Sequence, residues 1–197
     1  FFVGGGHKWN TLKEIQDLCL FRQKCLSIIR REVRELSARS EVIGIFLGGS
    51  LFKGTEWQTS DIDLGLILER QFDPEPMLSG LVEGIQITRW RDIKDSLQKL
   101  IDDYPESWYD AGAQWQVGWY SQSQCLFDRD GFAERLLSFI KNHRYDPAIV
   151  GKYVEMHVRQ AENELEDARA LCRSQRLHDA YRDIRQAFYI LTLAILE

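Results

Sequence analysis

Apolar residues recur at helical spacing over the first part of the chain. Between Thr11 and Ala38 they lie close to the 3.6-residue period, at Ile15, Leu18, Leu26, Ile29, Val33 and Leu36. Thr11 and Glu14 are spaced as in a capping box, in which each side chain satisfies an amide at the start of a helix. The pattern therefore predicts one long amphipathic helix over this range.

Short apolar runs predict four strands. The runs at 42–47 and 62–68 are continuous, as in strands that are buried on both faces, and two more strands are expected at 81–90 and 123–127. Pro74 and Pro76 exclude a helix between the second and third of these strands.

Further helices are predicted at 93–101, before Pro105, and through residues 132–140. Asp146-Pro147 then has good chemistry for a helix start, because Asp can cap free amides and Pro suits the first helical position. Only helices are predicted after it, the last from Tyr181 to Leu196. The aromatic-rich stretch from Trp108 to Tyr120 has no clean period and receives no assignment.

Helices and strands alternate up to about residue 145, and only helices follow. We therefore predict an α/β (α+β) fold, with a mixed sheet and flanking helices over residues 1–145. A C-terminal helical domain that helps to bind an acceptor is expected over residues 146–197. We leave open whether this domain is truncated.

The composition is that of a globular protein, since 44% of the 197 residues are hydrophobic and 28% are charged. No stretch approaches the roughly 20 consecutive apolar residues that a membrane span requires. The net charge is −5, and Lys and Arg are scattered. This argues against nucleic acid and favours a small molecule or a protein as the partner, with a homodimer left open.

The four cysteines, at positions 19, 25, 125 and 172, form neither a C-x-x-C pair nor a series of short spacings. A disulfide framework and a zinc site are therefore not expected, and free thiols fit a reducing cytoplasm. Residues 1–6 contain no initiator Met and no basic region before an apolar core. We expect neither a signal peptide nor an anchor, and leave open that the chain is a fragment.

The chemistry is concentrated between the first two predicted strands. Gly49 and Ser50 follow the first strand, and Asp61 and Asp63 open the second. Because alternate side chains of a strand share a face, the two carboxylates project together while Ile62 turns into the core. At about 6 Å they repel by roughly 1–3 kcal/mol, which a hard cation such as Mg²⁺ relieves. The backbone at Gly49 can approach a phosphate, to which amides and the Ser50 hydroxyl can donate.

This segment resembles the nucleotidyltransferase superfamily, which includes DNA polymerase beta, the aminoglycoside and lincosamide nucleotidyltransferases and the minimal nucleotidyltransferases of toxin–antitoxin pairs. The resemblance is strong over residues 42–68. The matching residues are Gly49, Ser50, Gly54, Ser60, Asp61 and Asp63. It implies that a nucleoside monophosphate is transferred from a Mg²⁺-bound NTP, with ATP as first choice, to an acceptor.

The resemblance also implies roles for individual residues. Asp61 and Asp63 would be catalytic metal ligands, and Gly49, Ser50 and Ser60 would bind the nucleotide. Lys53 and Arg89 are further candidates for phosphate contact, with surface exposure as the alternative. The aromatic residues between Trp108 and Tyr120 offer stacking on a nucleobase or flat acceptor, with core packing as the alternative.

Family members supply a third carboxylate from the next strand, and this sequence departs from that pattern. If the strand's isoleucines face the core, its opposite face carries Gly84, Gln86 and Thr88, none of which is acidic. Glu83 alternates with these residues and would therefore share the core-facing side of the strand with Ile85 and Ile87. Some relatives take the base from the helical domain, where the exposed side of the helices is expected to carry Glu155, Glu162, Glu164 and Glu166.

Two hypotheses follow. The first is a magnesium-dependent nucleotidyltransferase that acts on a hydroxyl of a small, antibiotic-like molecule or, as second choice, of a protein. The second is a catalytically degenerate nucleotidyltransferase-like module that binds a nucleotide or a partner and lacks the third acid.

Overall fold

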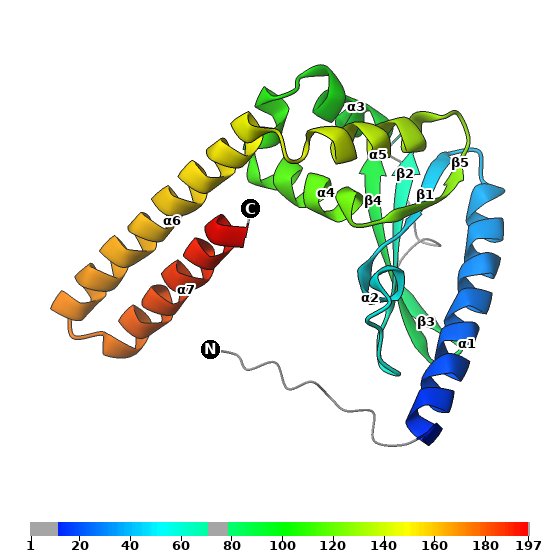
Figure 1. The fold of residues 1–197 in the computed structure, drawn as a ribbon, viewed down its shortest axis with the longest axis horizontal. Coiled ribbons are helices and arrows are strands. Elements are labelled where there is room, and N and C mark those ends of the chain that lie inside the picture. The colour runs from blue at the N-terminus through cyan, green and yellow to red at the C-terminus, as the bar shows by residue number, and fades with distance from the viewer. Residues whose placement is uncertain (1–11, 71–78, 197) are drawn as a thin grey trace.

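The structure, a computed structural model, describes residues 12–70 and 79–196 (Figure 1). The first part forms α1 (Leu12–Ser37), β1 (Val42–Leu47), α2 (Gly49–Lys53), β2 (Ile62–Leu68), β3 (Gly80–Val82) and β4 (Ile85–Ile93). The second part forms α3 (Lys94–Asp102), the 3-10 helix η2 (Glu106–Tyr109), α4 (Ala111–Ser121), β5 (Gln124–Asp128), α5 (Phe132–His143), α6 (Pro147–Arg173) and α7 (Leu177–Leu196). The predicted capping residue Thr11 and the prolines Pro74 and Pro76 lie outside the described residues.

The strands form one five-stranded sheet in the order β3-β4-β2-β1-β5. β2 and β4 are parallel, with Asp63 opposite Thr88 and Gly65 opposite Trp90. The other neighbouring pairs are antiparallel. The predicted mixed sheet with flanking helices is thus confirmed.

Helices cover both faces of the sheet. On one face α1 contributes Ile28, Ile29 and Leu36 to a cluster with buried side chains of β1, β2 and β4. On the other face α3, α4 and α5 pack against Phe46 and Ile67 of the sheet. Burial on both faces explains why all six residues of β1 are buried and why its sequence does not alternate with polar residues.

A buried ion pair fastens α1 to β4. Arg89 Nη2 donates to Glu32 Oε2 at 2.5 Å, and each side chain is only 9% exposed. Removing either partner would leave a buried charge without its countercharge. Arg89 therefore lies on the α1 side of the sheet, on the opposite parity from Thr88.

The single strand predicted at 81–90 is wrong, because this segment is a hairpin. β3 and β4 are antiparallel, with Val82 opposite Ile85 across a turn at Glu83 and Gly84. Both turn residues have positive φ, 53° and 80°, as in the two-residue turns that match the twist of a hairpin. β4 then continues to Ile93, and the helix expected there begins one residue later.

The stretch without a predicted element forms η2 and α4. One face of α4 buries Val117 and Tyr120, whereas Trp115 on another face is 48% exposed. Trp108 of η2 is fully buried and donates from Nε1 to the Leu100 carbonyl at 2.8 Å. Aromatic residues on more than one face of the helix remove the amphipathic period, so the hydrophobic pattern alone does not reveal it.

α6 and α7 form a hairpin that projects from the sheet and its covering helices (Figure 1). As predicted, Asp146 caps α6, accepting from the Ala148 amide at 2.9 Å, and Pro147 stands in the first turn. Ile149 and Tyr153 of α6 belong to the same buried cluster as α4 and α5. α6 is therefore continuous from that cluster into the hairpin, and the division into domains at residue 145 stays a prediction.

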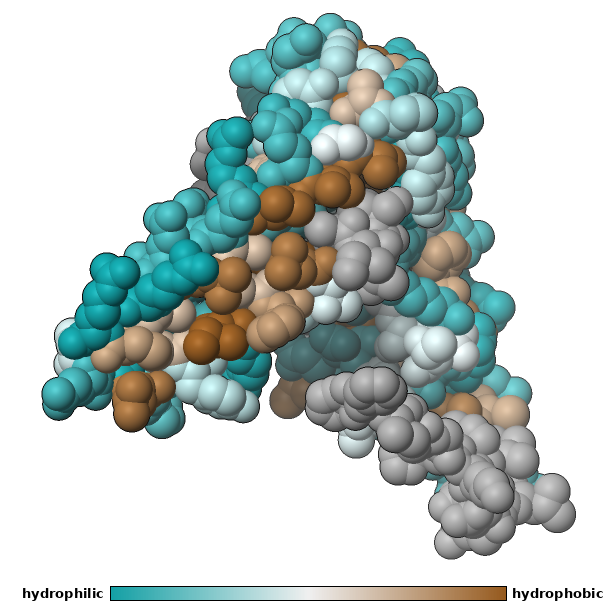
Figure 2. Space-filling model, turned by 60° about the vertical axis from the view of Figure 1, so that its left-hand side comes forward, coloured by the Kyte–Doolittle hydropathy of each residue, from teal (hydrophilic) through white to brown (hydrophobic). Residues whose placement is uncertain are grey.

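Hydrophobic side chains gather on the surface of the α6–α7 hairpin (Figure 2). In α7, Leu177, Tyr181 and Phe188 are 67%, 67% and 66% exposed. They do not make α7 a membrane span: within residues 12–70 and 79–196, no helix is both long and apolar enough to cross a bilayer.

We expect Gly65→Ala to destabilise the fold. A Cβ at Gly65 would overlap the indole ring of Trp119, and overpacking of this kind costs about 1–3 kcal/mol. Gly151→Ala is the control, because a Cβ at this exposed position of α6 meets no atom within 4 Å. Since alanine favours the helix, Gly151→Ala should stabilise by about 0.5–1 kcal/mol. Urea denaturation measures both changes, and unaltered stability of Gly65→Ala would contradict the packing of Trp119 on β2.

Candidate functional site

The structure brings the two motif aspartates together on one face of the sheet. Asp63 lies in β2 and Asp61 two residues earlier, and the intervening Ile62 is fully buried toward α1. Thr88 of β4 lies opposite Asp63, and its hydroxyl donates to Asp61 Oδ2 at 3.2 Å. The site therefore forms where β2 adjoins β4.

Gly49 forms the turn against which Asp63 lies. Its φ is +67°, in the left-handed region that favours glycine, and a Cβ there would overlap Asp63 Oδ2. The neighbouring Gly48 amide donates to the Asp63 carbonyl at 3.0 Å, which ties the turn to β2. Glycine at position 49 is thus required for the backbone conformation and for the space that the carboxylate occupies.

The Asp63 carboxylate lies in an unfavourable electrostatic environment. Burial, and then the charge of Asp61, raise the pKa of Asp63, while a hydrogen bond from the Trp90 side chain acts in the opposite direction. Neither Asp61 nor Asp63 forms an ion pair within the described part of the chain. Two adjacent carboxylates without a countercharge fit Mg²⁺, which prefers oxygen ligands and keeps positions for phosphate and water.

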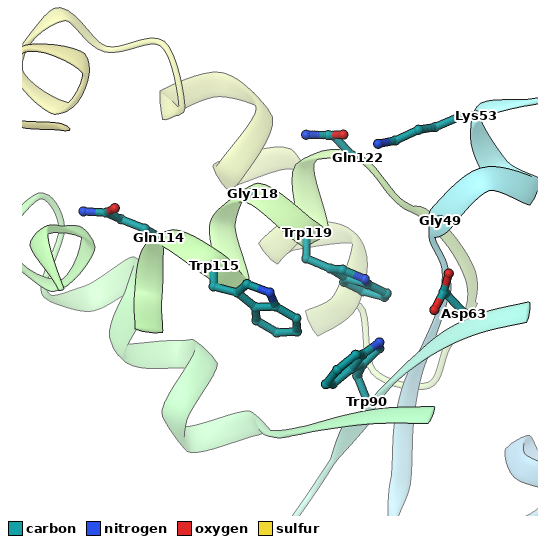
Figure 3. A pocket seen from close by; sticks show the side chains of 9 residues that line it. All are labelled: Gly49, Lys53, Asp63, Trp90, Gln114, Trp115, Gly118, Trp119 and Gln122. Carbon is teal, nitrogen blue, oxygen red and sulfur yellow. The ribbon is translucent and has the colours of Figure 1, made fainter. Parts of the chain in front are cut away.

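A pocket of about 480 Å³ opens beside Asp63 (Figure 3). α2 contributes Gly49 and Lys53, and the sheet contributes Asp63 and Trp90. The remaining wall comes from α4 and the residue after it: Gln114, Trp115, Gly118, Trp119 and Gln122. The volume is within the range of small-molecule sites.

Thr88 is closer to the aspartate pair than Gln86, the other residue predicted on this face in place of the family's third acid. Of the two candidates on this face, Thr88 contacts Asp61, whereas Gln86 is exposed and its amide donates to the Ile87 carbonyl at 3.4 Å. Glu83 forms an ion pair with Arg31 of α1 at 2.7 Å. No group of three or more His, Cys, Asp or Glu residues that could hold a metal ion occurs among the described residues.

The predicted phosphate contacts differ in where they lie. Lys53 lines the pocket beside Asp63. Arg89 is neither a phosphate contact nor a surface residue. Its side chain lies on the opposite face of the sheet, where it forms the buried ion pair with Glu32 of α1. Ser50 lies in α2 beside Gly49, and the Ser60 hydroxyl accepts from the Trp57 amide at 2.8 Å within the loop before Asp61.

A second buried carboxylate fastens that loop to α1. The Glu56 side chain is 2% exposed and accepts from Arg22 Nη1 at 2.7 Å. Its other oxygen has no hydrogen-bond partner in the described part of the protein. The loop between α2 and Asp61 is therefore held by α1, which precedes the motif in the sequence.

The C-terminal glutamates do not reach this pocket. Glu155 is exposed and accepts from Lys152 at 3.0 Å and from Arg159 at 3.1 Å, and the Lys152 hydrogen bond lowers the pKa of Glu155. Glu162 and Glu166 are exposed, and Glu164 is half-buried. In the part of the pocket wall that the described residues form, Asp63 is the one acidic side chain.

Sequence reasoning missed the wall that α4 contributes. Gln114, Gly118 and Gln122 recur every four residues, which is the spacing of one helical face, and this was the one signal in the sequence for that wall. Trp90 lies on the same strand parity as Thr88, so its place on this face follows from the register of β4.

Comparison with known proteins agrees with this geometry. Residues 26–108 match the model of the nucleotidyltransferase domain family, which confirms the predicted resemblance to the nucleotidyltransferase superfamily. A nucleotidyltransferase-like protein from Exiguobacterium sibiricum 255-15 aligns at 18% identity with a TM-score of 0.48, over 84% of this chain and 54% of its own. The chain thus spans about half the length of that protein. The comparison with curated proteins gives no match.

We expect Asp63→Asn to leave metal-free stability unchanged or to raise it, by about 1 kcal/mol at most, because it removes repulsion from Asp61. Asp92→Asn, on the same sheet face, is the control. Asp92 accepts from Tyr120 Oη at 2.8 Å and from Gln116 Nε2 at 2.6 Å, and Asn replaces this charged acceptor by a neutral one. Weakening of these partly buried, charge-assisted hydrogen bonds should cost about 1–3 kcal/mol. Thermal melts in EDTA measure both, and marked destabilisation by Asp63→Asn would identify Asp63 as a structural residue.

Proposed function

We propose that this chain is a Mg²⁺-dependent nucleotidyltransferase that transfers a nucleoside monophosphate from an NTP, with ATP as first choice, to an acceptor hydroxyl. The observation that carries the proposal is the pairing of Asp61 with Asp63, which lies against the Gly49 turn and lines a pocket of about 480 Å³. The family match of residues 26–108 supports the same class of reaction.

Each part of the site has a role in this proposal. Asp61 and Asp63 would hold Mg²⁺, which neutralises charge on the phosphates and on the leaving pyrophosphate. The Gly49 turn offers backbone amides to the triphosphate, Ser50 offers a hydroxyl and Lys53 a positive charge. Ser60 supports nucleotide binding through the loop that its hydroxyl stabilises.

In the proposed reaction the acceptor hydroxyl attacks the α-phosphorus, a P–O bond forms to the acceptor, and pyrophosphate leaves. Most of the rate enhancement comes from holding the two reactants in line and from charge stabilisation. The Thr88 hydroxyl is not a base at neutral pH. The acceptor proton must therefore pass to water or to a phosphate oxygen, unless the acceptor or a partner brings a base.

A second candidate function rests on the same observation. With Thr88 at the third acidic position, the chain can bind Mg²⁺-NTP through two carboxylates and yet fail to activate an acceptor. It would then be a nucleotide-binding or interaction module. Pyrophosphate release separates the candidates, because only the transferase produces it from Mg²⁺ and NTP in the presence of an acceptor.

The acceptor in the proposal is a small molecule, with a protein as second choice. The net charge of −5 opposes a polynucleotide, and the exposed apolar side chains of α7 offer a surface for an acceptor or a protein partner. Dependence on NTP, together with four free cysteines, is consistent with action in the cytoplasm.

We predict that Asp61→Ala and Asp63→Ala each weaken Mg²⁺-ATP binding at least about tenfold, because each removes a charged metal ligand. Asp95→Ala is the control, since Asp95 is an exposed acid on α3 outside the pocket lining and its loss should leave affinity unchanged. Isothermal titration of the folded variants gives the three affinities. Equal affinity of all three for Mg²⁺-ATP would overturn the metal assignment.

We further predict that Thr88→Asp raises Mg²⁺ affinity, by about tenfold on Coulombic grounds, because it adds a carboxylate at the position that contacts Asp61. Gln86→Asp introduces the same charge at the exposed position two residues earlier and should have a smaller effect. Titration with Mg²⁺ in the absence of nucleotide compares the two. A larger gain from Gln86→Asp would show that the third acidic position lies there.

A further inference from the structure

The pocket beside Asp63 has an aromatic end formed by Trp90 and Trp115, where Trp90 also hydrogen-bonds the proposed metal ligand Asp63. Trp90 of β4 and Trp115 of α4 both line it, and they are 43% and 48% exposed. Their rings meet edge to face, with centroids 5.2 Å apart and planes inclined by 62°. An exposed pair of indoles inside a pocket leaves a large apolar area in contact with water, which a ligand ring can cover.

Trp115 does not belong to the buried face of α4. The buried face of α4 is supplied by Ala113, Val117 and Tyr120, which pack in the main cluster. Trp119, one turn after Trp115, packs over the sheet, where Gly48 and Gly65 leave space for its ring. Trp115 lies outside this packing, and the one ring contact that it makes among the described residues is with Trp90.

Of the two indoles, Trp90 lies beside Asp63 and Trp115 lies farther from it (Figure 3). Gly49, Lys53 and Asp63 lie toward one side, and Trp115 with Gln114 lies toward the opposite side. Lys53 is the one cationic side chain among the described residues of the wall. A ligand that suits this arrangement carries negative charge at one end and a flat ring at the other.

From this arrangement we infer that the indoles of Trp90 and Trp115 receive the nucleobase of the NTP by stacking, while its phosphates lie toward Gly49 and Lys53. The inference rests on the proposed nucleotidyltransferase function and adds the base-binding end of its site. Because every base has an aromatic face, such stacking accepts all four bases and favours the larger purines. ATP and GTP should therefore bind more tightly than CTP and UTP.

The test compares ATP with inorganic tripolyphosphate, which has the phosphates without the base, by titration in the presence of Mg²⁺. In the wild type ATP should bind about tenfold more tightly than tripolyphosphate. In Trp115→Ala this ratio should fall close to one, with tripolyphosphate affinity unchanged. Trp115→Leu, which keeps an apolar side chain but no aromatic face, should behave likewise and guards against misfolding of the alanine variant.

Tyr145→Ala is the matched control, because Tyr145 is 66% exposed and lies outside the pocket lining. It should leave both affinities unchanged. If tripolyphosphate binds but the wild-type ratio is near one, or if the ratio survives in both Trp115 variants, the nucleobase does not stack there, and the aromatic end is left to a flat acceptor. If neither compound binds, the proposed function fails, and this inference fails with it.

Discussion

The parallel register of β2 and β4 determines where the side chains that the sheet contributes to the site lie. It sets Asp63 opposite Thr88 and Gly65 opposite Trp90. One face of the sheet therefore carries the two carboxylates together with Thr88 and Trp90. The opposite parity carries Ile62, Leu64 and Arg89 toward α1. A shift by one residue would exchange the two faces, burying carboxylates under α1 and exposing the core, and this makes the register strongly specified.

The same register explains the electrostatic character of the site. Arg89, the cation nearest in sequence to Thr88, is turned away and neutralised by Glu32, so it cannot compensate the aspartates. The charge of Asp61 and Asp63 is consequently left for a ligand to balance. The buried pair Arg89–Glu32 and the pair of exposed Arg22 with buried Glu56 both attach site-bearing segments to α1, which makes this helix part of the support of the site.

Much of the fold and of the motif follows from local sequence. Strands buried on both faces give continuous apolar runs, and Asp-x-Asp on a strand places two carboxylates together whatever the topology. The strand order and the parallel pairing are not local properties, and neither is the hairpin that replaces the third predicted strand. Its turn at Glu83 and Gly84 interrupts an otherwise strand-like sequence, with no proline or asparagine to mark it.

The pocket was also beyond local reasoning, because its aromatic residues come from segments 25 positions apart and one of those segments had no predicted element. The central claim is that Asp61 and Asp63 form a divalent-cation site beside this pocket, with Asp63 in its wall. It is tested most directly by a crystal structure with Mn²⁺ and a non-hydrolysable ATP analogue. The account predicts an anomalous-scattering peak at bonding distance from both carboxylates and from phosphate oxygens. A bound nucleotide with its metal elsewhere, or a peak that touches neither aspartate, would contradict it.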